Sequence, residues 1–516
     1  MWDRRLNGDG RGGRPATARR CLVGLSVAFA VSFFVLAAAR LNCPVALEWV
    51  EVALQDHVTR VLRGQALYVE PSLDFVPCIY TPLYYYVCAL VSKMIGVAGF
   101  APMRLVSLLS SSVVAVLVLR GVERETRDRL SAIVASGLFL ASYGLVDFWL
   151  DLGRVDAFFV VLTSSCLYLL RFNRSHKSAV VAGLLGALAI QAKQAALVAL
   201  APVVVHQLLV GRARGRWFVG ILVLITAAAV SLLDRGGWYR YYVFELPAQH
   251  PYANDRILMF WLFDFVPWFA PSLVLAGWTW RLPASSTSAG EREGRRLWLT
   301  AGSGLVATSW VSWFHAGAAR NVFLPACLAA SVMAGFVLAS FQRRVREVPA
   351  TQRESRETLG YACVIAQFAL LLYNPLDALP RRDLANEQVV STLPGEDVWI
   401  PARIQIDLNQ SHPSHAHWAP LMDVLKGGDT AIRAALQRSS AEVVATGKFE
   451  AIILPEQCEL VDGLVISEAL HENYEWRPLS SEGGVWTPRA RPPRAGRATP
   501  YGPVRLAADR EIANVP

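Results

Sequence analysis

The hydrophobic positions of this chain gather into long runs that are separated by short polar segments. A helix that rises about 1.5 Å per residue needs about 20 apolar residues to cross a hydrocarbon core of roughly 30 Å. Runs of this kind lie at 21–41, 104–120, 130–150, 155–171, 178–193, 195–210, 217–233, 257–280, 297–314, 322–341 and 359–374. The pattern predicts an all-α polytopic membrane protein with about 11 transmembrane helices.

The polar segments divide the chain into four parts. Residues 1–20 form a basic tail, 21–374 the transmembrane domain with a first external loop at 42–103, 375–486 a polar module and 487–516 a tail. Within the module, 397–401 and 449–456 read as strands and 430–446 as a helix, which predicts a small α/β fold. The last part is rich in Pro, Arg and Gly, a composition typical of disorder.

Composition and charge support a membrane protein. Hydrophobic residues make up 54% of the chain, and the mean hydropathy is +0.34. The net charge of +9 arises from arginines in the tail and in short loops, so we expect no nucleic-acid partner. Basic loops face the cytoplasm as a rule. The sequence thus predicts a multi-pass protein of the cell inner (plasma) membrane, with a cytoplasmic N-terminus and the loops 42–77, 234–256 and 315–321 and the C-terminus outside.

The number of crossings depends on the segment 78–98. The loop 120–129 is also basic, so only one of the stretches 78–98 and 104–120 can cross fully. Pro82 interrupts the first stretch and Lys93 lies near its end, and we therefore expect it to lie along the external interface. Residues 21–40 could instead be a cleaved signal, although the run is long for one.

The first external loop carries an acidic helix. If 45–63 is helical, Leu47, Val50, Leu54, Val58 and Val61 share one face, and Glu48, Glu51, Gln55 and Thr59 share another. Such a helix would lie at the interface with its carboxylates toward a water-filled cleft. A solvated polar face is the alternative. Cys43 and Cys78 in the same loop could be bridged in an oxidising compartment, or could remain free thiols.

Further ionisable residues stand at the external ends of later spans. They are Asp151, Arg154, Asp156, Lys193, Gln194, Asn254, Arg320 and Asn321. Any single cation there could simply extend to the interface. Acids beside cations on one face suit a reaction that needs a general base and a stabilised anionic leaving group.

A histidine group in the polar module offers a metal site as an alternative. His412, His415 and His417 lie close together in the sequence. No acidic or Cys partner stands at a recognisable spacing, so we interpret the segment as a polar loop and expect no metal there.

The order of these motifs resembles that of membrane glycosyltransferases with the GT-C fold. It is similar to bacterial relatives of dolichyl-phosphate-mannose protein mannosyltransferases and to the aminoarabinose transferase that acts on lipid A. That family has an acidic residue after the first span, a Gly about thirteen residues later and then a Pro-Pro-Leu-Tyr-Tyr-like segment. The matching residues here are Glu51, Gly64, Tyr68, the segment 81–85, Arg154, Asp156, Lys193 and the segment 321–325.

Two departures from the family's pattern matter. Val50 replaces the Asp of an Asp-Glu pair, and Thr81 replaces the first Pro. The missing carboxylate weakens the case for a two-carboxylate metal site, although Glu48 one turn earlier could compensate. The resemblance covers roughly 42–330.

The resemblance implies an inverting transfer of a sugar from a polyprenyl-phosphate donor to an acceptor on the external face. Glu51 would be the general base, with Glu48 and Asp56 as further catalytic acids. Arg154, Asp156, Lys193, Gln194, Arg320, Asn321, Tyr68, Tyr80 and Asn254 would bind substrate. A lipid, glycan or protein acceptor and a divalent cation remain open, and the membrane lipids are the remaining partner.

The main alternative is a transporter or flippase of a lipid-linked sugar. Transporters keep polar residues near the bilayer midplane, and Asp264 is the acid that fits this position. Most ionisable residues here stand at the ends of spans instead.

Overall fold

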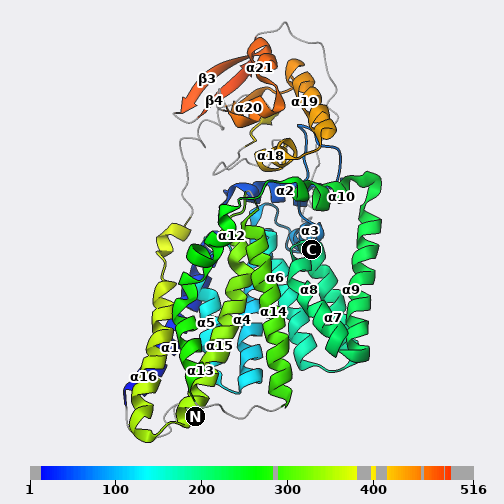
Figure 1. Ribbon diagram of the computed structural model, residues 1–516. Helices are drawn as coiled ribbons and strands as arrows, with labels where there is room; N and C mark the ends of the chain where they lie inside the picture. The colour runs from blue at the N-terminus through cyan, green and yellow to red at the C-terminus, as the bar shows by residue number, and fades with distance from the viewer. Residues whose placement is uncertain are drawn as a thin grey trace, which may run out of the picture.

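The computed structural model describes residues 13–282, 289–315, 317–379, 397–401, 415–454, 458–480 and 483–489. Long helices run side by side in a bundle, and a small module covers one end of it (Figure 1). We call this end the module end, and the opposite end, where α1 begins, the basic end. The mostly helical fold with a small C-terminal sheet confirms the predicted class.

Eleven α-helices of the described residues run in the bundle, and five of them are too short or too polar to count as candidate spans. The eleven are α1 (Arg14–Leu41), α4 (Phe100–Thr126), α5 (Arg129–Ala141), α6 (Val155–Phe172), α7 (His176–Ala192), α8 (Ala196–Val210), α9 (Arg212–Leu233), α13 (Ala270–Arg281), α14 (Ala289–Trp313), α15 (Leu324–Arg346) and α16 (Ala350–Leu370). Within the described residues, six helical stretches are long and apolar enough to cross a membrane. The outer surface of the bundle exposes large apolar side chains such as Leu209 (80%) and Trp280 (85%). Water would disfavour such surfaces, whereas lipid tails would not.

The apolar run 130–150 does not form one helix, contrary to the prediction. Helix α5 ends at Ala141, and the backbone then turns through Asp147 (φ 48°) and Phe148 (φ 62°), both in the left-handed region. The run stays hydrophobic because its later part is buried as an irregular segment, with side chains such as Leu150 in the core. This turn brings residues 151–154 to the module end of the bundle.

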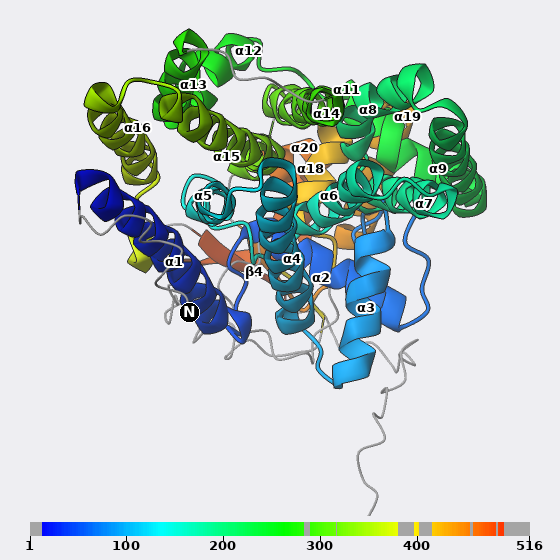
Figure 2. The same cartoon turned by 90° about the horizontal axis from the view of Figure 1, so that it is seen from below.

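Short elements cover the module end. Helix α2 (Trp49–Leu62) lies across the bundle, and α3 (Leu83–Ile95) follows it (Figures 1 and 2). The predicted helix 45–63 is thus confirmed, although it is shorter. Helix α3 has 13 residues, or about 20 Å, which is less than a hydrocarbon core. Its placement along the interface stays a prediction.

The second polar loop, which the sequence places at 234–256, is also partly helical. It holds a 3-10 turn Arg235–Gly237, α10 (Trp238–Arg240), a π-helical turn Tyr241–Glu245, α11 (Leu246–Gln249) and α12 (Asp255–Met259). A π-helical turn Phe260–Phe265 and a 3-10 turn Pro267–Phe269 join α12 to α13, and further 3-10 turns are Arg320–Phe323 and Pro375–Ala378.

Within its described residues, the module contains four strands and four helices. They are β1 (Val398–Trp399), α18 (Trp418–Lys426), α19 (Thr430–Ala445), β2 (Ala451–Leu454), α20 (Glu459–Leu464), α21 (Ser467–Asn473), β3 (Tyr474–Ser480) and β4 (Gly483–Pro488). The sheet order is β1-β2-β4-β3, and β1 pairs parallel to β2 while the other pairs are antiparallel. Both predicted strands and the helix between them are confirmed. The β3–β4 hairpin was not predicted, and it extends past residue 486 into the segment expected to be disordered.

The module and the external loops of the membrane domain share one hydrophobic core, which is separate from that of the bundle. Leu73 and Tyr242 pack in the same cluster as Trp399, Leu421 and Phe449. The backbone N–H of Ala416 also donates to the carbonyl of Leu73 at 2.8 Å. The first external loop, the second polar loop and the module therefore fold as one unit above the bundle.

Candidate functional site

Two charged groups meet where the first external loop contacts the bundle. Glu48 precedes α2, and Arg154 precedes α6. The Arg154 guanidinium lies 2.6 Å from Glu48 Oε2 and donates at 3.0 Å to the Tyr80 hydroxyl. The Glu48 side chain is 13% exposed and that of Arg154 4% exposed. Glu48 is therefore the more accessible of the two partners.

A second ion pair lies beside the first. Lys193 Nζ is 2.6 Å from Asp156 Oδ1, and the Asn321 amide donates to the same oxygen at 3.0 Å. Asp156 Oδ2 is buried and has no hydrogen-bond partner among the described residues. Lys193 Nζ also lies 5.8 Å from the ring centre of Tyr80, which connects the two pairs. A buried carboxylate oxygen without a partner is costly, so this oxygen indicates a place for a ligand or water.

Backbone contacts fix the segment that carries Tyr80. Tyr68 donates its hydroxyl to the carbonyl of Tyr80 at 2.7 Å, and the Gln194 amide donates to the carbonyl of Ile79 at 2.6 Å. Thr81 donates to the carbonyl of Ile190 at 3.0 Å. Tyr68 and Gln194 thus position the site, since their polar groups point to the backbone.

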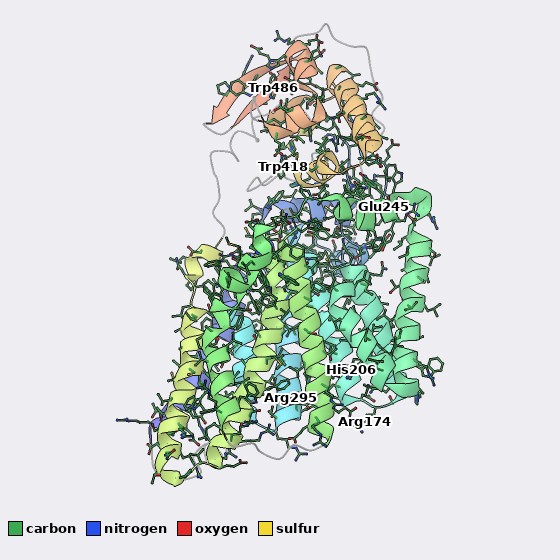
Figure 3. The ribbon with its side chains drawn as sticks, in the orientation of Figure 1. Arg174, His206, Glu245, Arg295, Trp418 and Trp486 are labelled. Carbon is green, nitrogen blue, oxygen red and sulfur yellow. The ribbon has the colours of Figure 1, made fainter. Side chains whose placement is uncertain are left out.

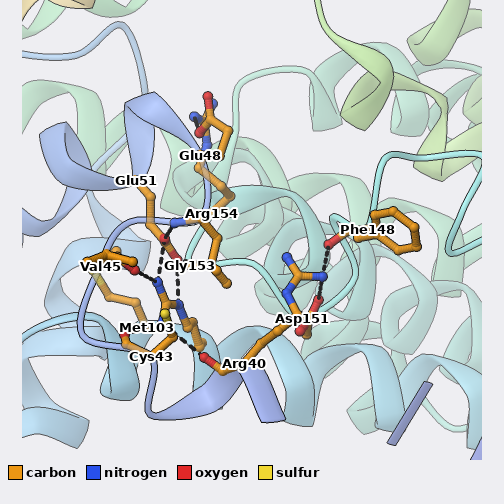
Figure 4. Close-up of polar contacts among 12 residues, drawn as sticks. Arg40, Cys43, Val45, Glu48, Glu51, Met103, Phe148, Asp151, Gly153 and Arg154 are labelled. Carbon is orange, nitrogen blue, oxygen red and sulfur yellow. Dashed lines mark hydrogen bonds and ion pairs between the residues drawn. The ribbon is translucent and has the colours of Figure 1, made fainter. Parts of the chain in front are cut away.

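Glu51 does not face a water-filled cleft, contrary to the prediction. Its side chain is fully buried, and both of its oxygens accept from the Arg104 guanidinium, at 2.9 and 2.8 Å. The backbone N–H groups of Leu47 and Gly153 complete its hydrogen bonds. Figure 4 shows this cluster beside Glu48 and Arg154. The helical face was assigned from α2 alone, and the residues that cover Glu51 come from other parts of the chain.

The two glutamates differ in their electrostatics. Burial alone would raise the pKa of Glu51, but Arg104 and the two N–H groups hold that pKa below its ordinary value. Burial raises the pKa of Glu48 above its ordinary value, because the single Arg154 contact does not offset it. Glu48 is therefore the better proton acceptor of the pair.

Three predicted residues lie apart from these ion pairs. Arg320 is half-exposed and lies 3.7 Å from Asp147. Asn254 is exposed at the start of α12. Asp56 is buried on α2, where its charge acts on Cys78. The structure thus brings together Glu48, Tyr80, Arg154, Asp156, Lys193 and Asn321, with Glu51, Tyr68 and Gln194 as their neighbours.

Several residues of this region were not predicted as site residues. Arg104 also donates to the carbonyls of Arg40, Cys43 and Val45. A further buried ion pair joins Arg40 to Asp151 at 3.2 Å (Figure 4). Arg40 and Arg104 stand at the ends of predicted apolar runs, and this position is the sequence feature that could have indicated them as site residues.

The module adds a carboxylate to this end of the protein. Asp423 on α18 lies 3.7 Å from His250, and burial raises the pKa of its carboxyl to about 7. Its charge also acts on Tyr80 and Cys78. No sequence motif marks Asp423, because its place depends on how the module docks.

The carboxylates of the site are already engaged by cationic side chains. The carboxylates of Glu48 and Asp156 are each paired with a cation, and the same holds for Glu51. Among the described residues, no three His, Cys, Asp or Glu side chains are grouped as a metal site. His415 contacts Asp74 and Asp397, and His417 accepts from the N–H of Ala419 at the start of α18, while His412 lies outside the described residues. Cys43 and Cys78 are both free thiols.

This fold is the GT-C fold of membrane glycosyltransferases, as the sequence resemblance predicted. The family model described as dolichyl-phosphate-mannose-protein mannosyltransferase matches residues 78–233. That segment includes Tyr80, Arg154, Asp156 and Lys193.

Solved structures with the same fold include ArnT from Cupriavidus metallidurans. Its apo form has a TM-score of 0.56 and covers 89% of this chain and 98% of its own. Its form bound to undecaprenyl phosphate has a TM-score of 0.57 and covers 90% and 98%. Both are 12% identical to this chain, so they establish the fold and not the activity. No curated protein matches the sequence.

Proposed function

We propose that this protein is an inverting glycosyltransferase of the cell inner (plasma) membrane. It would move a sugar from a polyprenyl-phosphate donor to an acceptor hydroxyl on the extracytoplasmic face. The observation that carries the proposal is the pairing of Arg154 with Glu48 beside the pairing of Lys193 with Asp156. The module end would face outside, and the basic end the cytoplasm, in line with the positive-inside rule.

The cations suit the leaving group of such a transfer. A polyprenyl phosphate gains negative charge as the bond to the anomeric carbon breaks. Arg154 and Lys193 lie in a largely buried site, where charge is poorly screened, so they would stabilise that phosphate. Two groups of the site would orient the donor: the Tyr80 hydroxyl would donate to a sugar or phosphate oxygen, and the free oxygen of Asp156 would accept from a sugar hydroxyl.

Glu48 replaces Glu51 as our candidate for the general base. A general base needs a free lone pair and a pKa near the working pH. Glu51 has all of its oxygens engaged with Arg104, Leu47 and Gly153, whereas Glu48 is more accessible and holds one charged partner. Glu48 would accept the proton of the acceptor hydroxyl as the hydroxyl attacks the anomeric carbon. A direct displacement of this kind inverts that carbon without a covalent enzyme intermediate.

The first test is the release of polyprenyl phosphate from a polyprenyl-phosphate sugar by the purified full chain. Glu48→Gln should lower the rate of transfer about 10²- to 10⁴-fold, the usual range for loss of a general base. Glu245→Gln is the matched control, since Glu245 forms an exposed pair with Arg240 far from Arg154 in the sequence. The control should retain the parent rate.

The pH profile separates a base from a merely structural residue. Because the pKa of Glu48 is raised, the parent rate should fall on the acid side at a pH above the ordinary range of a glutamate. Glu48→Gln should lose this acid limb. A variant that transfers sugar at the parent rate, or that keeps the limb, would contradict the assignment.

The transporter alternative finds no support in the position of Asp264. Its carboxylate accepts from the Trp313 indole N–H at 2.8 Å, which meets its need for a polar partner without a substrate. Release of polyprenyl phosphate would in any case distinguish the two, because a flippase leaves the sugar attached.

A further inference from the structure

A cavity opens at the basic end, away from the candidate site. It has a volume of about 230 Å³ and is lined by His206 and Val210 of α8 and by Arg292, Glu293 and Arg296 of α14. Figure 3 shows His206 in the lower part of the bundle, near Arg174 and Arg295. The cavity therefore lies between two neighbouring helices at the opposite end from Arg154 and Lys193.

The charges around this cavity favour an anion. Glu293 is the acidic residue of its lining, and it is paired with Arg174 at 3.1 Å. The lining also contains Arg292 and Arg296, whose side chains are both exposed. Its arginines therefore outnumber its single glutamate. The Arg296 side chain makes no hydrogen bond or ion pair within the part of the chain that the structure describes. Its guanidinium can therefore bind phosphate in a bidentate manner, and Arg292 adds positive charge beside it.

His206 is an independent sign of a missing partner. Both of its ring nitrogens are buried, and neither has a hydrogen-bond partner among the described residues. An imidazole has one donor and one acceptor when neutral, and leaving both unmet is costly. A polar ligand beside the imidazole would offset part of this cost, because its oxygen atoms can accept and its hydroxyl groups can donate.

The surface next to the cavity is suited to lipid tails. Val205, Leu208 and Leu209 on α8 are 54%, 53% and 80% exposed. Val210 continues this apolar surface into the lining of the cavity. A ligand here would thus have a charged group between the arginines and hydrocarbon along α8.

We propose that this cavity binds the headgroup of an anionic phospholipid from the leaflet at the basic end. The phosphate would lie between Arg292 and Arg296, a headgroup hydroxyl or phosphate oxygen would contact His206, and the acyl chains would follow α8. Basic pockets between transmembrane helices are known to hold such headgroups. The proposal does not depend on the glycosyltransferase function.

Native mass spectrometry of the full chain in detergent tests the proposal. The probes are phosphatidylglycerol and phosphatidylcholine of the same acyl chains. The parent protein should retain phosphatidylglycerol in preference to phosphatidylcholine. The double variant Arg292→Gln/Arg296→Gln should bind phosphatidylglycerol about 30-fold more weakly, since each arginine at a membrane surface contributes about fivefold.

A matched variant removes the same charge elsewhere on this end of the protein. Arg216 and Arg281 are exposed arginines that do not line the cavity. The double variant Arg216→Gln/Arg281→Gln should retain the parent's affinity for phosphatidylglycerol. Equal losses in the two double variants would overturn the proposal, because they would show attraction by overall charge alone.

His206→Phe gives a second readout that does not change charge. It should also weaken phosphatidylglycerol binding, while an unchanged melting temperature in detergent would show that the fold is intact. Inorganic phosphate at millimolar concentration should not displace the lipid. Displacement by phosphate would overturn the proposal in favour of a site for a soluble anion.

Discussion

At the scale of single residues, Glu51 and Glu48 show how neighbours decide the role of a carboxylate. They are one turn apart on the same polar stretch, and sequence alone favoured Glu51 as the base. Glu51 is enclosed by Arg104 and two backbone N–H groups, so it serves to hold the first external loop on the bundle. Glu48 remains next to the cations of the site.

Glu51→Gln should therefore act on stability. The substitution leaves the Arg104 guanidinium buried without its anion, and breaking a buried pair in this way costs about 3–5 kcal/mol. Thermal unfolding in detergent should show a clearly lower melting temperature. Glu123→Gln is the control, since its partner Arg120 is 62% exposed and such pairs contribute at most about 1 kcal/mol. Similar melting temperatures for the two variants would contradict the role of Glu51.

His57 should make the external loop sensitive to acid. Its Nε2 accepts from the backbone N–H of Cys78 at 2.9 Å, and burial lowers its pKa to about 4 from 6.5. The folded protein thus resists protonation that the unfolded chain accepts. Stability should be unaffected above pH 6.5 and should fall by about 3 kcal/mol as the pH drops to about 4.

Melting temperatures of the parent and of His57→Gln over this pH range check the effect. The Gln side chain can still accept a hydrogen bond but does not titrate there. It should therefore lose less stability between pH 6.5 and 4 than the parent. Parallel curves would show that other groups cause the acid sensitivity.

At the scale of elements, continuous hydrophobicity predicted the long helices well and the irregular segments poorly. The runs at 21–41 and 104–120 correspond to α1 and α4. The run 130–150 was equally apolar, yet its second half is buried as a turn. Apolar composition reports burial or contact with lipid, and it does not by itself fix the backbone conformation.

The contact between the module and the first external loop depends on a charged cluster. Asp74 contacts both Lys448 and His415, and His415 also contacts Asp397. His415 and Lys448 hold the pKa of Asp74 well below its usual range. The stabilisation that they give to the Asp74 carboxylate is thus present above its ordinary pKa and is lost only in stronger acid.

Asp74→Asn should loosen the module at neutral pH. The substitution removes the charge that Lys448 and His415 share, so amide hydrogen exchange in α18 should become several-fold faster. Glu475→Gln is the matched control, because Glu475 and its partner Arg477 are both exposed on β3, apart from α18. Unchanged exchange in Asp74→Asn would show that the hydrophobic core alone holds the module.

At the scale of the whole molecule, the candidate site was partly predictable. Arg154 and Asp156 stand at the start of one apolar run, Lys193 at the end of a second and Asn321 just before a third. All three places lie on one predicted side of the membrane, so the alternating direction of the spans brings these residues together. Arg104 and Asp423 could not be assigned in this way. Their roles depend on how the first loop and the module pack, and a single sequence does not show such contacts.

The shared core predicts that the membrane domain needs its module. A chain that ends at residue 379 would expose Leu73, Val76, Tyr241, Tyr242 and Leu246, which now pack against the module. Exposed apolar patches of this kind promote association. The truncated protein should be polydisperse on size-exclusion chromatography in detergent and should melt at a lower temperature. A monodisperse truncation with the parent's melting temperature would show that the two parts fold independently.

The same packing sets an order of assembly during synthesis. Loop residues from the first half of the chain, such as Leu73 and Tyr242, pack against residues that are synthesised last, from Trp399 to Trp486. The module can pack on α2 and the external loops only after the final segment has left the ribosome and reached the same side of the membrane. An incompletely made copy would therefore leave these apolar loop residues exposed to quality-control proteases.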